Sequence, residues 1–215
     1  MEIRYTLLSD GSSDRALMPI LTWLLRKHAV NCAIQPEWAD LRRLPRPPKK
    51  LSEKICRSIE LWPCDLLFIH RDAENQTHGQ RLKETNVGIK EAEIIKKSVL
   101  PPAICVIPVR MQEAWLLFNE HALRQASGNP NGKQPVKMPP LNHVEELPNP
   151  KETLHKLLID VSGCKGRKLK KFRPREKAII IANFIDDFSP LDNLSAFKAL
   201  ESSIQQIVQD QGWSW

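Results

Sequence analysis

The sequence lacks several features that mark common classes of protein. No apolar run approaches the roughly 20 residues that cross a bilayer, so no membrane association is expected. The first residues, MEIRYTLLSDG, have neither a basic region nor a small-residue cleavage site of a secretory signal, which favours a cytoplasmic location. The five cysteines are scattered and never spaced as C-x-x-C. This distribution indicates neither a zinc finger nor a disulfide framework.

Three common catalytic and nucleotide-binding motifs are also absent. The chain has no G-x-x-x-x-G-K-[ST], no G-x-G-x-x-G and no G-x-S-x-G. Phosphate-loop NTPases, dinucleotide-dependent dehydrogenases and α/β-hydrolases are therefore disfavoured.

The composition is that of an ordinary globular protein with a basic excess. Of the 215 residues, 41% are hydrophobic and 27% charged. Lys plus Arg exceed Asp plus Glu by 32 to 25, a net charge of +7, which favours a polyanionic partner such as nucleic acid.

Short apolar stretches alternate with helical patterns through the first half of the chain. Ile3 to Leu8, Asp65 to His70 and Ala103 to Pro108 are predicted strands, and a further short strand is expected at Cys32 to Ile34. Helices are expected from Asp14, from Leu51, over 83–100 and over 112–126. This alternation predicts an α/β fold with a mostly parallel central sheet flanked by helices.

Three regions are expected along the chain. An α/β core spans residues 1–127, and a proline-rich loop or insertion with six prolines spans 128–150. Residues 151–215 form a helical extension that packs on the core, beginning at the helix start Asn149-Pro150. Trp213 and Trp215 are expected to pack against the body or a partner.

Acidic residues follow three of the predicted strands. Asp10, Asp72 and Glu113 each come one to five residues after a strand end, and the carboxyl ends of parallel strands meet at one edge of a sheet. Clustered carboxylates repel one another unless Mg²⁺ or Mn²⁺ neutralises them. The opposing interpretations are a turn residue for Asp10, a solvated loop for Asp72 and a helix-dipole acid for Glu113. Asp14 is interpreted as an acid of the first helical turn, where the helix dipole favours a negative charge.

The order of these motifs resembles the Toprim domain of topoisomerases, primases and the OLD and RloB-like bacterial defence nucleases. The residues that carry the resemblance are Asp10-Gly11-Ser12-Ser13-Asp14 and Ile69-His70-Arg71-Asp72-Ala73-Glu74. Arg110 to Leu117 resembles a Glu-Ala-Trp-Leu segment of small Toprim-like bacterial proteins. The resemblance covers roughly Ile3 to Phe118, and it implies a Toprim-like, Rossmann-like fold with a metal-dependent nuclease site.

Two positions depart from the Toprim pattern. Toprim domains usually present a glutamate where this chain has Asp10 and an aspartate where it has His70. An imidazole can still ligate Mn²⁺ or act as a general base on an attacking water. His70 or Glu74 is therefore expected to orient the nucleophile.

A basic segment lies in the C-terminal region. Seven cations occupy the eleven positions 165–175, and such density is typical of phosphate contacts or of a solvated linker. The residues expected to bind nucleic acid are Lys165, Arg167, Lys168, Lys170, Lys171 and Arg173. A second basic strip, 42–50, could flank the same groove or form a proline-rich docking surface.

Together these features predict a Toprim-type nuclease that hydrolyses or nicks nucleic acid in bacterial anti-phage defence. Asp10, Asp72 and Glu113 would hold Mg²⁺ or Mn²⁺. The alternative is a catalytically silent Toprim-like subunit that binds or signals beside an ATPase of a defence system. Either protein could form a homo-oligomer.

Overall fold

Four parallel strands form the centre of the fold. In the computed structural model, which describes residues 1–213, the sheet has the order β2-β1-β3-β4. The strands are β1 (Glu2–Leu8), β2 (Ala33–Ala39), β3 (Leu66–His70) and β4 (Ala103–Val106). The fold is therefore α/β and Rossmann-like, as predicted, and the sheet is entirely parallel.

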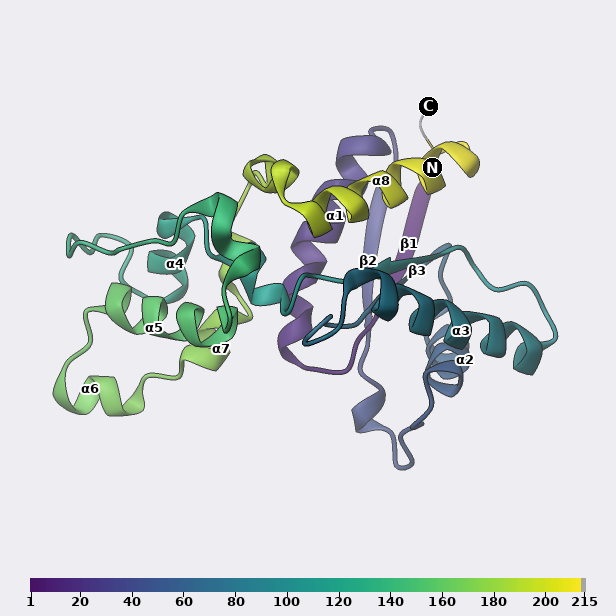
Figure 1. Ribbon diagram of the computed structural model, residues 1–215, viewed down its shortest axis with the longest axis horizontal. Coiled ribbons are helices and arrows are strands. Elements are labelled where there is room, and N and C mark those ends of the chain that lie inside the picture. The colour runs from purple at the N-terminus through teal and green to yellow at the C-terminus, as the bar shows by residue number, and fades with distance from the viewer. Residues whose placement is uncertain (214–215) are drawn as a thin grey trace.

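Helices cover both faces of the sheet (Figure 1). Helices α1 (Leu17–His28) and α8 (Ser195–Asp210) pack together on one face, whereas α2 (Leu51–Leu61) and α3 (His78–Lys96) pack together on the other. Alternate residues of β3 divide between the two apolar cores, with Phe68 facing α1 and with Leu67 and Ile69 facing α2. All five residues of β3 are buried, which explains its uninterrupted apolar sequence.

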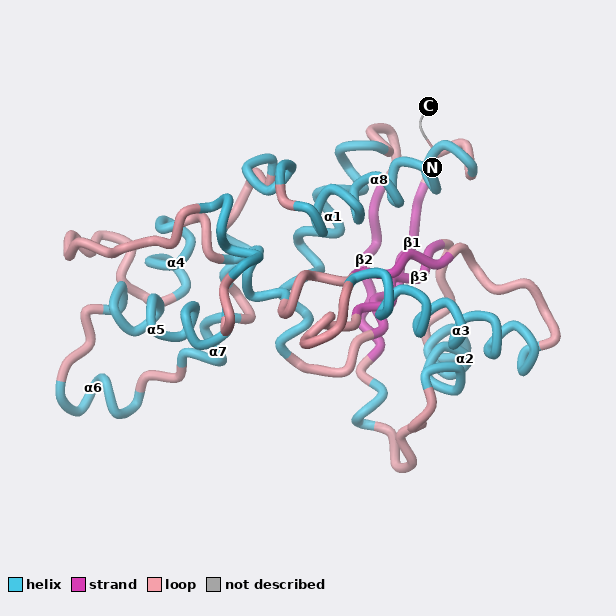
Figure 2. Tube along the Cα trace, viewed as in Figure 1, coloured by secondary structure: helices cyan, strands magenta, loops and turns pink. Residues whose placement is uncertain are grey.

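A helical lobe, defined here as residues 120–178, lies beside the sheet. It contains α4 (Glu120–Ala126), α5 (Pro150–Ser162), α6 (Gly166–Lys171) and α7 (Pro174–Ala178). Figure 2 shows the described strands gathered outside this lobe, which consists of helices and loops. One continuous apolar cluster nevertheless runs from β1 and α1 through α4 and α5 to α8, so the lobe shares its core with the sheet.

Short 3-10 turns connect many of these elements. They are η1 (Ser13–Ala16), η2 (Leu41–Arg43), η3 (Gln112–Leu116), η4 (Leu141–Glu146), η5 (Ile181–Phe184) and η6 (Ser189–Asn193).

The proline-rich segment 128–150 is anchored by one carboxylate. Glu145 accepts hydrogen bonds from the backbone N–H and hydroxyl of Ser195 and from the N–H of Ala196, at the start of α8. The indole of the fully buried Trp115 also donates to Glu145, at 3.4 Å. The segment thereby caps α8 from a distance of 50 residues in sequence.

Several element boundaries differ from the sequence prediction. The expected helix over 112–126 is divided into η3 and α4, and α3 begins at His78 and not at Lys83. Pro19 causes no break, because it lies in the first turn of α1, where its missing N–H has no intrahelical partner to lose. Asn149 caps α5 as predicted by accepting from the Glu152 N–H, and Gly163 ends that helix at φ 63°. Trp213 is buried as expected, while Trp215 lies outside the described residues.

Candidate functional site

The strand order places a topological switch point between β1 and β3. From β1 the chain crosses to β2 on one side, and it then returns past β1 to β3 on the other. In open α/β sheets, ligands bind at the carboxyl ends of the strands at such a point. Here a cavity of about 400 Å³ lies at this point, lined by residues that follow β1 and β3, among them Asp10, Asp14, His70 and Asp72.

The loop after β1 folds back on Asp14. The Gly11 N–H donates to Asp14 Oδ2 at 2.7 Å, and the Ser13 hydroxyl donates to Oδ1 at 3.2 Å. A Cβ atom at position 11 would lie 2.9 Å from the Asp14 carboxylate, so only glycine allows this close approach. The Asp14 side chain is consequently fixed and buried at the start of η1.

The loops after β3 and β4 run side by side beyond the ends of their strands. The N–H groups of Arg71, Ala73 and Glu74 donate to the carbonyls of Val106, Pro108 and Arg110, respectively. Glu74 and Arg110 adopt the left-handed conformation, at φ 54° and 59°. Strained backbone of this kind clusters at functional sites. The hydrogen bonds between the two loops also position η3, which follows the β4 loop, at the switch point.

Gln112 connects the loops after all three strands. Its backbone N–H donates to Asp72 Oδ1 at 3.1 Å, and its side-chain Nε2 donates to Asp14 Oδ1 at 2.9 Å. Gln112 is buried, and its Oε1 atom has no hydrogen-bond partner among the described residues. A buried carbonyl oxygen without a donor is costly, and it offers one more oxygen to any cation that enters.

His70 is held in one orientation. Its Nδ1 lies 3.0 Å from the Val106 carbonyl, which can only accept, so Nδ1 carries the proton. Its Nε2 lies 3.5 Å from Asp72 Oδ1. In the neutral ring, Nε2 is therefore a free lone pair directed toward the Asp72 carboxylate.

Burial and neighbouring negative charges raise the pKa of Asp72 and of Glu113. Burial raises the pKa of Asp72, and the negative charges of Asp14 and Glu74 raise it further, against the opposing effect of His70. Burial also raises the pKa of Glu113, with additional contributions from Asp72 and Asp14 that oppose Lys151. Gln112 is bonded to both Asp14 and Asp72, and Glu113 follows Gln112 in the chain; these three acids, from the ends of β1, β3 and β4, are named here the acidic cluster.

Four cations surround the carboxylates. Arg71 and Arg81 come from β3's loop and α3, whereas Lys151 and Arg175 come from α5 and α7 of the helical lobe. Lys151 Nζ lies 3.8 Å from Glu113. The cavity thus has its acids on the sheet side and basic groups on both sides, an arrangement suited to a phosphate group beside the acids.

The predicted site residues are only partly brought together. Asp10 lines the cavity but is 66% exposed and forms an ion pair with Lys54 of α2. Glu74 also lines the cavity, with its carboxylate 3.8 Å from Arg81. Glu113 lies beside Lys151 within the acidic cluster. The position after β1 that joins the cluster is Asp14, because the backbone turns at Gly11 before the side chain enters.

Sequence reasoning missed Asp14, Gln112 and the four cations as site residues. Asp14 was interpreted as a first-turn acid, which is also its place in η1. Gln112 carried one available signal, its position immediately before Glu113. Lys151 and Arg175 lie far along the chain, and nothing in their local sequence indicates proximity to the acids.

The donor set of the cluster suits a hard divalent cation. It comprises the Asp14, Asp72 and Glu113 carboxylates, the unpartnered Gln112 Oε1 and the His70 Nε2, and oxygen-rich sets of this kind favour Mg²⁺ or Mn²⁺. Within residues 1–213, no group of three or more His, Cys, Asp or Glu side chains is close enough to hold a metal ion. The carboxylates must therefore move toward one another to bind one.

Most of the basic segment lies away from this cavity, and only its last cation, Arg175, lines it. Residues 166–171 form α6, which has no buried residue and lies at the outer end of the helical lobe (Figure 1). None of the residues Lys165, Arg167, Lys168, Lys170, Lys171 and Arg173 lines the cavity. Direct contact between α6 and a phosphate held at the acidic cluster would require an extended ligand.

Comparison with protein-family models, with curated proteins and with solved structures finds no match to this chain. No helix in the described part of the chain combines the length and apolar character needed to cross a membrane.

Proposed function

We propose that the protein is a metal-dependent nuclease of Toprim type that hydrolyses phosphodiester bonds of nucleic acid. The observation that supports the proposal is that Asp14 and Asp72 line one cavity at the switch point of the sheet and are both bonded to Gln112, opposite Lys151 and Arg175 of the helical lobe. Burial and neighbouring acids raise the pKa of Asp72 and of Glu113, and such groups concentrate at functional sites.

The proposed metal ligands differ at one position from the sequence-based set. Asp14 replaces Asp10, because Asp10 is directed to Lys54. Asp14, Asp72 and Glu113 would hold Mg²⁺ or Mn²⁺ together with Gln112 Oε1, and the ion would supply charge neutralisation and an acidified water.

The remaining roles belong to the side chains around the cluster. Lys151 and Arg175 would bind the phosphate oxygens from the opposite wall of the cavity, and Arg71 would bind them from the sheet side. His70 would accept the proton of the attacking water at Nε2, because its Nδ1 proton is fixed on the Val106 carbonyl. Asp72 would then stabilise the imidazolium at 3.5 Å.

The test is cleavage of plasmid DNA, single-stranded DNA and RNA in the presence of Mg²⁺ or Mn²⁺. Wild type is expected to cleave at least one of these substrates, and Asp72→Asn and Asp14→Asn to lose about 100-fold or more of the activity. Asp160→Asn is the matched control, since Asp160 is an exposed acid of α5. Cleavage that survives in both cluster variants would refute the assignment.

A second function is favoured by the contacts that the acids already make with other side chains and backbone groups of this chain. Asp14 and Asp72 accept hydrogen bonds from Gln112, Glu113 lies beside Lys151, and the described chain contains no preformed three-residue metal group. We infer that a catalytically silent Toprim-like subunit, acting beside an ATPase in anti-phage defence, is the alternative. Isothermal titration with Mn²⁺ separates the two proposals, because only the nuclease requires binding that Asp72→Asn abolishes.

A further inference from the structure

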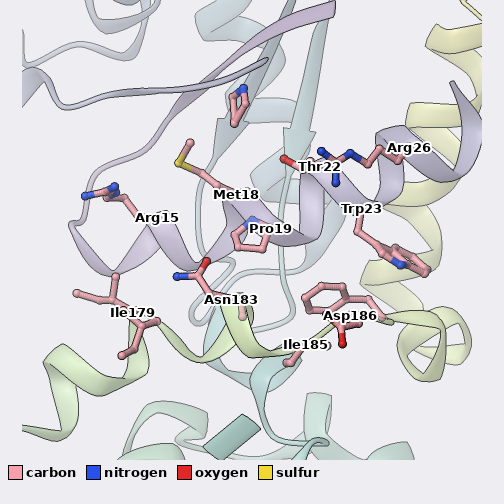
Figure 3. Close-up of a pocket in the computed structure, with 14 residues that line it drawn as sticks. Arg15, Met18, Pro19, Thr22, Trp23, Arg26, Ile179, Asn183, Ile185 and Asp186 are labelled. Carbon is pink, nitrogen blue, oxygen red and sulfur yellow. The ribbon is translucent and has the colours of Figure 1, made fainter. Parts of the chain in front are cut away.

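A groove lined by aromatic and basic residues adjoins the candidate site. It runs between α1 and the segment 179–188 and has a volume of about 600 Å³ (Figure 3). One wall is the face of η1 and α1 that carries Arg15, Met18, Thr22 and Arg26, which recur at helical spacing. This face is distinct from the face of α1 that is buried against the sheet, which carries Leu17, Ile20, Leu21 and Leu24.

The groove is continuous with a second cavity of about 670 Å³. The two cavities share Arg15, Met18 and Pro36, and the second continues past Trp38 to Trp62. Arg15 lies over the Trp38 ring, 5.3 Å from its centroid, and Arg42 lies 5.5 Å from the same centroid. Together the two cavities form one extended surface, named here the α1 groove.

The α1 groove leads directly to the acidic cluster. Arg15 follows Asp14 in η1, and η1 contacts both α7 and η5. Arg175 of α7 lines the acidic cavity, while Ile179, one turn later, lines the groove. On each wall, therefore, a residue that lines the groove lies within one helical turn of a residue that lines the candidate catalytic cavity.

The charged groups of the groove favour phosphate. Arg15 of η1 and Arg26 in the last turn of α1 lie toward opposite ends of the groove (Figure 3). Neither arginine forms an ion pair with a carboxylate in the described chain. Asp186 is the acid on the first cavity, and Glu37 and Asp40 lie on the second, where Asp40 is already paired with Arg42 and Arg43.

The apolar groups of the groove favour exposed bases. The partly exposed Trp23 lines it beside Met18 and packs on the buried Phe188, with ring centroids 5.9 Å apart. Aromatic and apolar walls contact the faces of bases, and those faces are hidden in a stacked duplex. We propose that the α1 groove binds single-stranded nucleic acid and delivers it to the acidic cluster, an inference that rests on the proposed nuclease function.

The test is binding of fluorescein-labelled oligothymidylate and oligouridylate, measured by anisotropy in EDTA so that no cleavage occurs. Wild type is expected to bind the single strands more tightly than a duplex of equal length. The double variant Arg15→Ala/Arg26→Ala is expected to bind about tenfold more weakly. For this double variant, the slope of log K against log salt concentration should be shallower by about 1.4, because two phosphate contacts are lost and each contributes about 0.7 on a single strand. The DNA and RNA arms identify the sugar that the groove prefers.

Two further variants distinguish binding in the groove from attraction to basic charge elsewhere on the protein. Trp23→Leu keeps an apolar side chain and is expected to weaken binding about fivefold or more without changing the salt dependence. Lys168→Ala/Lys170→Ala in α6 removes the same charge outside the groove and is expected to bind within about twofold of wild type. Thermal unfolding by circular dichroism verifies that each variant is folded.

The proposal is overturned by any of three results. They are no binding of single strands by wild type, equal affinity for duplex and single strand, or unchanged binding in the arginine variant, whether or not the α6 variant loses binding. Because binding is measured without metal, it is independent of cleavage. A protein that binds through the groove and never cleaves refutes the nuclease alone, whereas cleavage with unchanged binding in the arginine variant refutes the groove alone.

Discussion

Position 112 should accept an amide side chain but not a carboxylate when no metal ion is bound. In Gln112→Glu the amide Nε2 that donates to Asp14 Oδ1 at 2.9 Å is replaced by an acidic oxygen. Two unit charges at that separation repel by about 6 kcal/mol at an effective dielectric constant of 20. The folded variant can avoid this repulsion by binding one proton, which restores a donor toward Asp14.

The cost of that proton sets the magnitude of the effect. Protonating a glutamate of ordinary pKa, about 4.3, costs about 3.7 kcal/mol at pH 7 and about 1 kcal/mol at pH 5. The variant is therefore expected to lose about 3.7 kcal/mol of unfolding free energy relative to wild type at pH 7. About 2.6 kcal/mol of this loss should be recovered at pH 5, because the folded variant binds more protons than the unfolded chain and its stability falls as pH rises.

Urea unfolding followed by circular dichroism at both pH values measures this difference directly. The matched control is Gln205→Glu, the same change on an exposed face of α8, which should alter stability by less than about 0.5 kcal/mol at either pH. Mn²⁺ should stabilise Gln112→Glu more than wild type, since the cation replaces the proton. A loss of stability in Gln112→Glu that is equal at pH 7 and pH 5 would refute the reasoning.

Three further predictions concern stability. Asp72→Asn should be more stable than wild type at pH 7, because the raised pKa of Asp72 means that its negative charge destabilises the folded wild type. This difference in stability should shrink as the pH falls toward 4 and Asp72 becomes protonated. Paired urea titrations across this pH range measure the difference, and a difference independent of pH would contradict the prediction. Trp115→Ala should lose about 3–5 kcal/mol, since the side chain is fully buried and lies edge-on to Phe197 at 5.4 Å; an unfolding free energy within about 1 kcal/mol of wild type would contradict this packing. Asn149→Ala should lose about 1 kcal/mol with the cap on the Glu152 N–H, and Asn149→Asp, which keeps an acceptor, should restore most of it in thermal melts.

Local patterns in the sequence were sufficient for the class of fold. The apolar run ending at His70 predicted a fully covered strand, because a strand inside a parallel sheet is buried on both faces. The alternation of such runs with helical patterns predicted parallel strands joined by helices, and Asn149 and Pro150 marked the start of α5 through their own backbone chemistry. Each of these signals depends on residues within one turn or one strand of each other.

The membership of the acidic cluster was decided only by the tertiary structure. Asp10 and Asp14 both follow the end of β1 closely in sequence, but the turn at Gly11 buries Asp14 beside Gln112 and leaves Asp10 to Lys54. The direction of a side chain after a strand depends on that turn and on its hydrogen-bond partners, which lie up to 98 residues away.

The cations that face the cluster also escape sequence reasoning. The density of charge at 165–175 drew attention to α6, yet only Arg175 of that segment lines the acidic cavity. Lys151, an isolated cation, joins it there through the packing of the helical lobe against η1 and η3. The sequence by itself determined which stretches form strands and helices, because those depend on local hydrophobic period and capping. Which charges meet across the cavity was decided by the tertiary structure alone, because Coulomb interactions depend on distance in space and not along the chain.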